Sequence, residues 1–413
     1  MSNARRWLIA AAALLLLVAL AAYWATRPQR VSALVMRQIG SALGLEITAG
    51  GASQYELRGG PRLVLRDVVA REPGAKAPLL RAERIDVSVP WSTVRSRGAN
   101  LDITRVELDA PVLDLAALQH WLSTRPESES RTPMLSKGLR VRDGRVLGDG
   151  WSVDAIALDV SRVLPDQRVD ARVSGSLVDA PTRVPFALDF AMTKPANGAG
   201  MSAHGTVTLV QPERTLASRI KVSGPLHVGD GGIRIAPLRM SLASRLKQDE
   251  LDLPFAFALN GTLRTDGGTV ALSPASIALR GDDLVPDLDA RAAFAYTDKA
   301  ALHLDGLLAT WPEAWPALPP PIGQSDSPLP VVLDYAGPFD FSSVARLQLT
   351  RDDTHFDGRF KLPDVLAWID APSESPIPPL SGRITTPTLD VAGAILEGVD
   401  VRLHDPALDA AAP

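Results

Sequence analysis

The chain contains no cysteine among its 413 residues. Disulfide frameworks, thiolate metal sites and cysteine nucleophiles are therefore excluded. Histidine is also scarce, with six residues, and none of them has the spacing of a zinc-binding motif. A nucleophile elbow and a phosphate-binding glycine loop are absent as well. The sequence carries no specific catalytic motif, and we expect no enzyme activity, no cofactor and no bound metal.

Charge and aromatic residues are limited too. The net charge of −4 gives no support for a nucleic-acid partner, which would favour a basic protein. Phe, Trp and Tyr together make up 5% of the chain, whereas there are 34 prolines and 31 glycines. Such a composition is typical of many short strands separated by turns.

One long apolar run lies near the N-terminus. Residues 7–25 are nineteen consecutive residues without a charge, and Arg5 and Arg6 precede them. As a helix they would span about 28 Å, close to the thickness of the hydrocarbon core of a bilayer. The run predicts a transmembrane anchor within residues 1–26. The alternative is a cleaved signal peptide with the small-residue site Ala19-Leu20-Ala21.

From Leu45 onward the apolar residues alternate with polar ones, which is the pattern of half-buried strands. In residues 253–263, for example, Leu253, Phe255, Phe257 and Leu259 point to one side of an extended strand. We expect roughly twenty short strands in an antiparallel meander. Turn residues separate the apolar runs at 59–60, 143–144, 231–232, 266–268 and 357–358. The predicted fold class is mainly β, with one long antiparallel sheet after the anchor.

A few short helices and loops interrupt this sheet. Helical spacing of apolar residues predicts helices over 31–43, 113–122 and 362–370. Residues 123–133, 311–330 and 371–379 have the composition of linkers or surface loops. Trp311 and Trp315 flank Glu313 in the second of these loops. This arrangement could form a sugar platform, but a proline-rich loop that caps an apolar edge is the favoured interpretation.

The most site-like polar cluster is the sequence "RDDTHFDG". Its side chains Asp352, Asp353, His355 and Asp357 could suggest a metal site. The alternation of His355 and Asp357 with apolar or small residues favours the solvated side of a strand, and the ligand spacing of a calcium loop is absent. We therefore predict solvated strand and turn residues there.

Both ends of the chain resemble the AsmA family of bacterial envelope proteins. The similar segments follow the anchor as "GLEITAGG" (44–51), "GGPRLVLRDVVAREP" (59–73), "LLRAERIDVSVPW" (79–91) and "LDITRVELDAPVLDL" (101–115), and the last is "SGRITTPTLDVAGAILEGVDVRLHD" (381–405). The order and spacing of these segments carry the resemblance, whereas the middle of the chain matches only in its alternating pattern.

The resemblance implies a single-pass protein of the bacterial inner membrane with most of its chain in the periplasm. AsmA-like proteins are grouped with bridge-like lipid transfer proteins, in which a curled sheet forms a hydrophobic β-groove. The expected organisation is an anchor at 1–26, an AsmA-like helix and β region at 27–122, and a repetitive β-groove region at 134–413. The expected partners are membrane lipid, above all phospholipid, and the inner membrane through residues 7–25. A distal envelope protein is a further candidate partner.

On this interpretation, acyl chains would lie against the apolar side chains of the central strands. The expected groove-lining residues are Phe186, Leu188, Phe190, Leu253, Phe255, Phe257, Leu259, Phe294, Tyr296, Leu302, Leu304, Val331, Leu333 and Tyr335.

Two questions stay open at the level of sequence. Alternation fits a dry sandwich of two sheets as well as a trough that is open to lipid. The functional alternatives to lipid transfer are a non-enzymatic factor for outer-membrane protein assembly, which would bind proteins at sheet edges, and an envelope glycan-active enzyme.

Overall fold

The structure is a computed structural model. It describes residues 40, 44–50, 54–56, 61–91, 103–124, 134–229, 232–266, 268–282, 284–315, 317–318, 320–338, 340–370, 378–391 and 393–409. The chain divides into two compact units, residues 1–195 and 196–413. This division is a different one from the segments 27–122 and 134–413, which rest on a resemblance and on linker composition. Each unit is described by itself.

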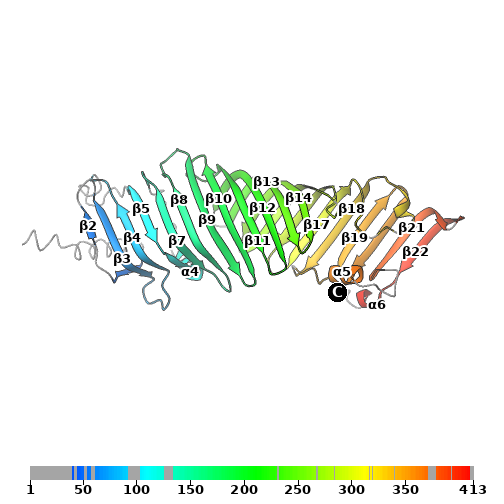
Figure 1. Cartoon of the computed structure of the whole chain (residues 1–413), viewed down its shortest axis with the longest axis horizontal. Coiled ribbons are helices and arrows are strands. Elements are labelled where there is room, and N and C mark those ends of the chain that lie inside the picture. The colour runs from blue at the N-terminus through cyan, green and yellow to red at the C-terminus, as the bar shows by residue number, and fades with distance from the viewer. Residues whose placement is uncertain are drawn as a thin grey trace, which may run out of the picture. The chain divides into compact units, whose positions relative to one another are not determined.

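The sheet of the first unit is mainly antiparallel (Figure 1). Its strands are β1 (Glu46–Ala49), β2 (Gln54–Glu56), β3 (Arg62–Arg71), β4 (Leu80–Ser88), β5 (Arg105–Asp109), β6 (Val112–Asp114), β7 (Leu139–Leu147), β8 (Ser152–Val160), β9 (Val169–Asp179) and β10 (Thr182–Met192). β1 and β2 both pair with β3, and β4 pairs with both β5 and β6. β7 runs parallel to β5 and β6, an exception to the predicted meander.

The second unit is a pure antiparallel meander, as the sequence predicted. Its strands are β11 (Ala199–Val210), β12 (Arg214–Gly229), β13 (Gly232–Gln248), β14 (Leu251–Asp266), β15 (Thr269–Gly281), β16 (Leu288–Tyr296), β17 (Ala300–Leu308), β18 (Leu329–Gly337), β19 (Ala345–Arg351), β20 (Thr354–Phe360), β21 (Leu380–Val391) and β22 (Ala394–Leu403). Each strand pairs with the next along the chain. The strands are not uniformly short, because β12, β13 and β14 have 16, 17 and 16 residues.

The described helices are short. They are α4 (Leu115–Ser123), the 3-10 turn η1 (Ile322–Gln324), α5 (Leu362–Asp370) and α6 (Pro406–Asp409). α4 and α5 confirm the helices predicted at 113–122 and 362–370. No helix in the described ranges is long and apolar enough to span a bilayer. The predictions for 7–25, for nearly all of 31–43, for the turn at 59–60, for most of 123–133, for residue 231 of the turn at 231–232 and for 371–377 lie outside the described residues.

Two predicted turns are wrong. Asp143–Gly144 lies inside β7 and Asp357–Gly358 lies inside β20. Gly144 stands at an irregularity of β7, where a Cβ atom would lie 2.9 Å from the Val141 side chain. A glycine inside a strand can mark such a close approach rather than a turn. The turn predicted at 266–268, by contrast, does join β14 to β15.

Irregularities in the strand pairing of the second unit follow one line across the sheet. Register shifts occur after Ser223 in β12, after Ile235 in β13, after Gly261 in β14 and after Leu272 in β15. Three of these sites contain a proline, namely Pro225, Pro237 and Pro274, and proline cannot donate to the ladder of hydrogen bonds. Because bulges bend and twist a strand, a row of them bends the sheet along this line.

The first unit has a comparable line. Asp67 in β3, Ala110 between β5 and β6, Asp143 in β7 and Ala155 in β8 all have φ angles between 47° and 52°. This left-handed backbone is uncommon for residues other than glycine and accompanies local bends. Ala110 and Pro111 thereby divide one strand path into β5 and β6.

Candidate functional site: the apolar face of the sheet

One face of each unit's sheet is apolar over its whole width. In the first unit, residues paired across seven strands form the row Leu65, Ile85, Leu108, Val141, Leu158, Val173 and Leu188. In the second unit, the row Ala203, Val222, Met240, Leu259, Ile277, Ala290, Gly306, Val331, Leu349, Phe356, Ile384 and Val401 crosses all strands from β11 to β22. We call these sides the apolar faces and the opposite sides the outward faces.

All of the predicted lining residues lie on an apolar face. Phe186, Leu188 and Phe190 are on β10 of the first unit. The other eleven are in the second unit: Leu253, Phe255, Phe257 and Leu259 on β14, Phe294 and Tyr296 on β16, Leu302 and Leu304 on β17, and Val331, Leu333 and Tyr335 on β18. The strand register brings these eleven residues to one side of one sheet.

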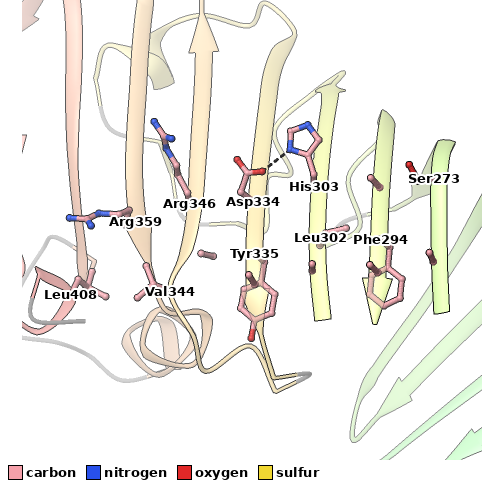
Figure 2. Close-up of a pocket in the computed structure, with 16 residues that line it drawn as sticks. Ser273, Phe294, Leu302, His303, Asp334, Tyr335, Val344, Arg346, Arg359 and Leu408 are labelled. Carbon is pink, nitrogen blue, oxygen red and sulfur yellow. Dashed lines mark hydrogen bonds and ion pairs between the residues drawn. The ribbon is translucent and has the colours of Figure 1, made fainter. Parts of the chain in front are cut away.

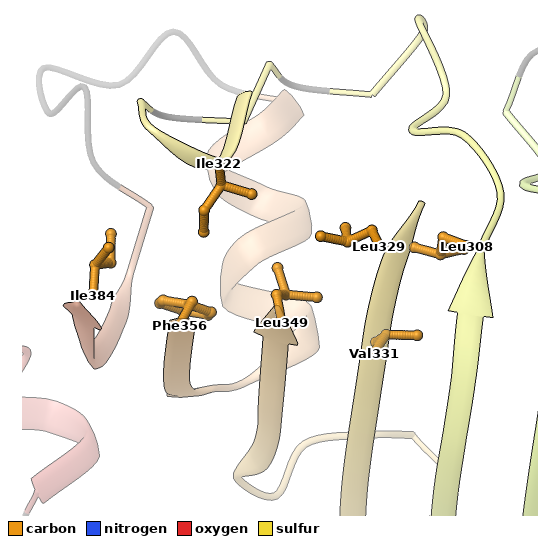
Figure 3. Packing of buried hydrophobic residues seen from close by; sticks show 7 residues of the cluster. All are labelled: Leu308, Ile322, Leu329, Val331, Leu349, Phe356 and Ile384. Atoms are coloured by element: carbon orange, nitrogen blue, oxygen red, sulfur yellow. The ribbon is translucent and has the colours of Figure 1, made fainter. Parts of the chain in front are cut away.

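Part of this face in the second unit is covered by the chain itself. The connection between β17 and β18 lies over Leu308, Leu329, Leu349 and their neighbours, and its Ile322 is only 2% exposed (Figure 3). Trp311 and Leu318 of the same connection pack against this cluster. We call β17–β21 together with this cover the capped segment. The prediction that the proline-rich loop caps an apolar edge is thus confirmed.

Polar contacts hold the cap in place. Arg351, which is buried at the end of β19, donates from Nη1 to the Ile322 carbonyl at 2.9 Å. The Ser327 hydroxyl donates to Asp352 Oδ1 at 2.9 Å, and Trp315 Nε1 donates to the Leu284 carbonyl at 3.0 Å. The Trp311 and Trp315 rings meet edge to face with their centroids 4.8 Å apart, so they do not form one flat sugar platform.

A second cover lies at the opposite end of the same strands. Phe341, in the connection from β18 to β19, packs on Tyr335 with ring centroids 4.9 Å apart. The Tyr335 hydroxyl donates to the Pro338 carbonyl, and Tyr335 is buried. Tyr335 is therefore a core residue of the capped segment, and so is Val331, which is buried in the cluster beneath the first cover.

Strands β11–β15 differ, because no described residue of the second unit from outside these strands packs in the cluster on their apolar face. The cluster there contains Leu238, Leu259 and Ala275, and all of its members come from these strands themselves. Leu259 is 7% exposed although no covering segment contacts it, whereas Phe255 and Phe257 are half-buried. We call β11–β15 the open segment. Burial without a cover is what a sheet that bends toward its apolar face would produce.

Small residues make room for this bend. A Cβ atom at Gly261 would lie 2.7 Å from the Pro274 carbonyl oxygen and 2.8 Å from the Ala275 side chain. One at Gly224 would lie 2.4 Å from the Pro237 carbonyl oxygen. Real Cβ contacts are longer than this, so larger residues would force the strands apart along the bend.

The outward faces are polar and hold many ion pairs. In the first unit, the paired residues Asp86, Glu107, Arg140, Asp159, Arg172 and Asp189 form a charged row. In the second unit, the guanidinium of Arg346 donates to Asp357 and lowers the pKa of that carboxyl. Arg383 lowers the pKa of Asp400 in the same way. From Glu107 to Asp189 the charges alternate in sign, and this alternation stabilises the solvated side and explains the polar half of the sequence pattern.

The polar residues at 352–357 lie in a turn and on a strand, as the sequence predicted. Asp352 and Asp353 form the turn between β19 and β20, and His355 and Asp357 lie on the outward face of β20. Among the described residues, no group of three or more His, Asp or Glu side chains could hold a metal ion.

The outward face also carries a hollow that sequence reasoning missed. It has a volume of about 720 Å³ and a floor of small side chains that includes Ala271, Ala295 and Ala301 (Figure 2). His303 Nδ1 and Asp334 Oδ1 are 2.6 Å apart at its rim. Ser273 also lines the hollow, but β16 separates its strand from β17, and strands two apart are about 10 Å distant. The three residues therefore do not form a nucleophile–base–acid array.

Comparisons with protein-family profiles, with curated proteins and with solved structures each found no match. The AsmA resemblance therefore stays a prediction from sequence.

Proposed function

We propose that this protein binds acyl lipid, with phospholipid as the principal cargo, along the apolar faces of its sheets and transfers it between envelope membranes. The curled sheet would form a hydrophobic groove in which acyl chains lie across the strands. Residues 7–25 would anchor the chain in the bacterial inner membrane and leave the bulk of it in the periplasm. The transfer needs no catalytic residue, cofactor or metal.

The open segment carries this proposal. Its apolar face spans five long strands, includes the half-buried Phe255 and Phe257, and has no described cover. Large uncovered apolar surfaces on proteins usually bind an apolar partner. The described strands of the second unit form a single sheet, which supports a groove rather than a sandwich of two sheets.

The energetics of lipid transfer suit such a face. A methylene group gains about 0.8 kcal/mol when it leaves water for an apolar environment. An acyl chain therefore exchanges a bilayer for a groove at little net cost if most of its methylenes stay covered. The capped segment would be closed to cargo, because its own side chains already fill that part of the face.

Charge placed on the groove wall tests the proposal. The double variant Phe255→Asp/Phe257→Asp should lose co-purifying lipid, as measured by mass spectrometry of an organic extract, while its circular dichroism stays unchanged. The matched control is Ala256→Asp/Ala258→Asp, which adds the same charges to the outward face of the same strand. Equal lipid content in all three proteins, or no lipid in the unaltered protein, would contradict lipid binding.

One observation favours a second candidate, a non-enzymatic factor for assembly of outer-membrane proteins. β22 pairs only with β21 among the described strands, and Ile395, Leu396 and Val401 on it are exposed, Ile395 by 71%. An unpaired strand edge can take up a strand of another protein. A photocrosslinker at Val401 that captures an outer-membrane precursor would favour this function, and one that reacts only with β21 would argue against it.

A further inference from the structure

We infer that the outward face of β11–β13 contains a binding site for a phosphate-bearing ligand. The site is a hollow of about 420 Å³. Its lining includes six polar residues, Ser202, His204, Lys221, Ser223, Arg239 and Ser241, and the intervening Ala203, Val222 and Met240 of the same strands. It lies on the opposite side of the sheet from the apolar face, so this inference goes beyond the proposed lipid groove and does not rest on it.

Strand register places these six side chains in a compact block. Ser202, Ser223 and Arg239 are paired across three adjacent strands, and His204, Lys221 and Ser241 are paired two residues further along. Paired side chains on one face are about 5 Å apart, and successive rows are about 7 Å apart. A tetrahedral oxyanion between the rows would be within reach of several donors at once.

The chemistry of the block favours an anion. Lysine and arginine carry only donors, and each serine hydroxyl can donate as well. Arginine binds phosphate oxygens in bidentate geometry, and lysine supplies a compact positive charge. A cation would find no carboxylate among the residues that line this hollow.

The absence of acids here contrasts with the rest of the outward face. The residues paired with Lys221 are His204 and Ser241, and those paired with Arg239 are Ser223 and Asn260. By comparison, Arg280, Arg346 and Arg383 each form an ion pair with an aspartate. The alternating charge that stabilises the outward face elsewhere, including Arg245 of β13 with Asp252, is thus interrupted around Lys221 and Arg239.

The basic character continues along the same strands. Arg219 lies two residues from Lys221 on β12, and its paired residues are Thr206 and Ala243. Arg219 lines an adjoining hollow of about 830 Å³, whose other charged residues are Arg245, Arg280, Asp282 and Asp287. Arg245 and Arg280 form ion pairs with Asp252 and Asp289, so Arg219 is the cation that extends the basic block. Like charges on neighbouring strands repel each other, and a bound anion would remove that repulsion. The neighbouring hollow gives room for the remainder of a larger phosphate ester.

Removing the two cations tests the site. Calorimetric titration of the full-length chain in a non-ionic, phosphate-free detergent would use inorganic phosphate and glycerol 3-phosphate as probes. The variant Lys221→Gln/Arg239→Gln should bind both probes at least tenfold more weakly. The control Lys299→Gln/Arg402→Gln removes the same charges elsewhere on the second unit and should bind as the unaltered chain does. The conservative variant Lys221→Arg/Arg239→Lys should retain saturable binding.

The two probes separate two sources of the phosphate group. Tighter binding of glycerol 3-phosphate would identify a lipid headgroup or a related ester as the ligand, and equal binding would identify a small free phosphate. Glycerol 3-phosphate has no acyl chain, and the lipid content of the variant should be unchanged, so the outcome is independent of the groove. Sulfate, titrated in the same way, tests for unspecific attraction of anions. The inference is wrong if the unaltered chain shows no saturable binding of phosphate, or if sulfate and phosphate bind equally weakly. It is also wrong if the control and the Lys221→Gln/Arg239→Gln variant lose affinity alike.

Discussion

The open and capped segments of the second unit have the same sequence pattern but different surroundings. In both, large apolar residues alternate with polar ones, and the row from Met240 to Val401 crosses both without interruption. They differ in the connections between strands. The three turns that join β12 to β13, β13 to β14 and β14 to β15 have two residues each, whereas the connection from β17 to β18 runs from residue 309 to residue 328. A tight turn cannot reach back over a sheet, and a connection of that length can.

The comparison shows that alternation identifies an apolar face but does not say what covers it. A dry core and a lipid-binding surface need the same side chains on the same strands. The presence of a long connection with its own apolar residues, such as Trp311, Leu318 and Ile322, is what distinguishes them in this chain.

A charge introduced on the apolar face should reveal the largest difference in stability between the two segments. Leu329 is 0% exposed beneath the cap, and Phe257 is half-buried in the open segment. Leu329→Asp should destabilise the second unit by about 4 kcal/mol or more, because it leaves an unpaired charge in a packed core. Phe257→Asp should cost less than about 2 kcal/mol, since solvent can reach an open wall. Urea denaturation followed by circular dichroism would measure both, and equal losses would mean that the open segment is a closed core.

Loosening the cap should make the capped segment resemble the open one. Ile322→Ala removes the side chain that contacts the cluster around Leu349 and Phe356 and should cost about 2–3 kcal/mol. We expect stronger fluorescence of a hydrophobic dye such as ANS, because the apolar face beneath becomes accessible. Leu366→Ala, at an exposed position of α5, serves as the control and should change neither quantity. Unchanged dye binding in Ile322→Ala would show that other residues suffice to hold the cap.

A side chain at the bend should disturb the open segment alone. Gly261→Ala places a methyl group within 3 Å of Pro274 and Ala275 and should cost about 1–3 kcal/mol. Gly229→Ala, at the end of β12 with no atom within 4 Å, should be neutral within about 0.5 kcal/mol. Hydrogen exchange should become faster in β13–β15 of the first variant and stay unchanged in β18–β20. If β13–β15 exchange as slowly as before, the bend does not depend on the small residue.

The sequence alone predicts the fold class and the apolar face of the second unit, but it does not predict the bend of the sheet. Alternation predicted the mainly β fold, and the eleven lining residues of the second unit do share one face. It did not reveal the bend, because bulges depend on local backbone geometry at residues such as Ala155, where nothing in the residue type indicates a φ of 52°. The turns predicted at Asp143–Gly144 and Asp357–Gly358 are wrong for a related reason, because an Asp-Gly dipeptide occurs both in turns and inside strands.

The phosphate hollow was also missed, although its signal is visible in the sequence. Arg219 and Lys221 stand two residues apart in "SRIKVS", so a strand places both on one face. Read alone, the pair looks like part of an ordinary solvated face. Its significance depends on the neighbours contributed by β11 and β13, and only the register provides those.

Acid should produce the smallest difference between the two segments. The outward face of the capped segment contains Asp357, whose pKa is lowered chiefly by the hydrogen bond from Arg346. A carboxyl with a lowered pKa in the folded state stabilises the fold above the pKa of the unfolded chain, about 4, and this contribution is lost as the pH falls through the folded value. Strands β12 and β13 of the open segment contain no carboxyl side chain of their own, and Lys221 and Arg239 on them have no acid among their paired residues, so no comparable loss is expected in these two strands. Because the Asp357 side chain is 45% exposed, solvent screens the pair and the effect should stay below about 1 kcal/mol.

Hydrogen exchange, corrected for its intrinsic pH dependence, should show β19–β20 losing protection relative to β12–β13 between pH 6 and pH 3. Arg346→Gln should abolish that difference, and a difference that persists in this variant would assign it to another group.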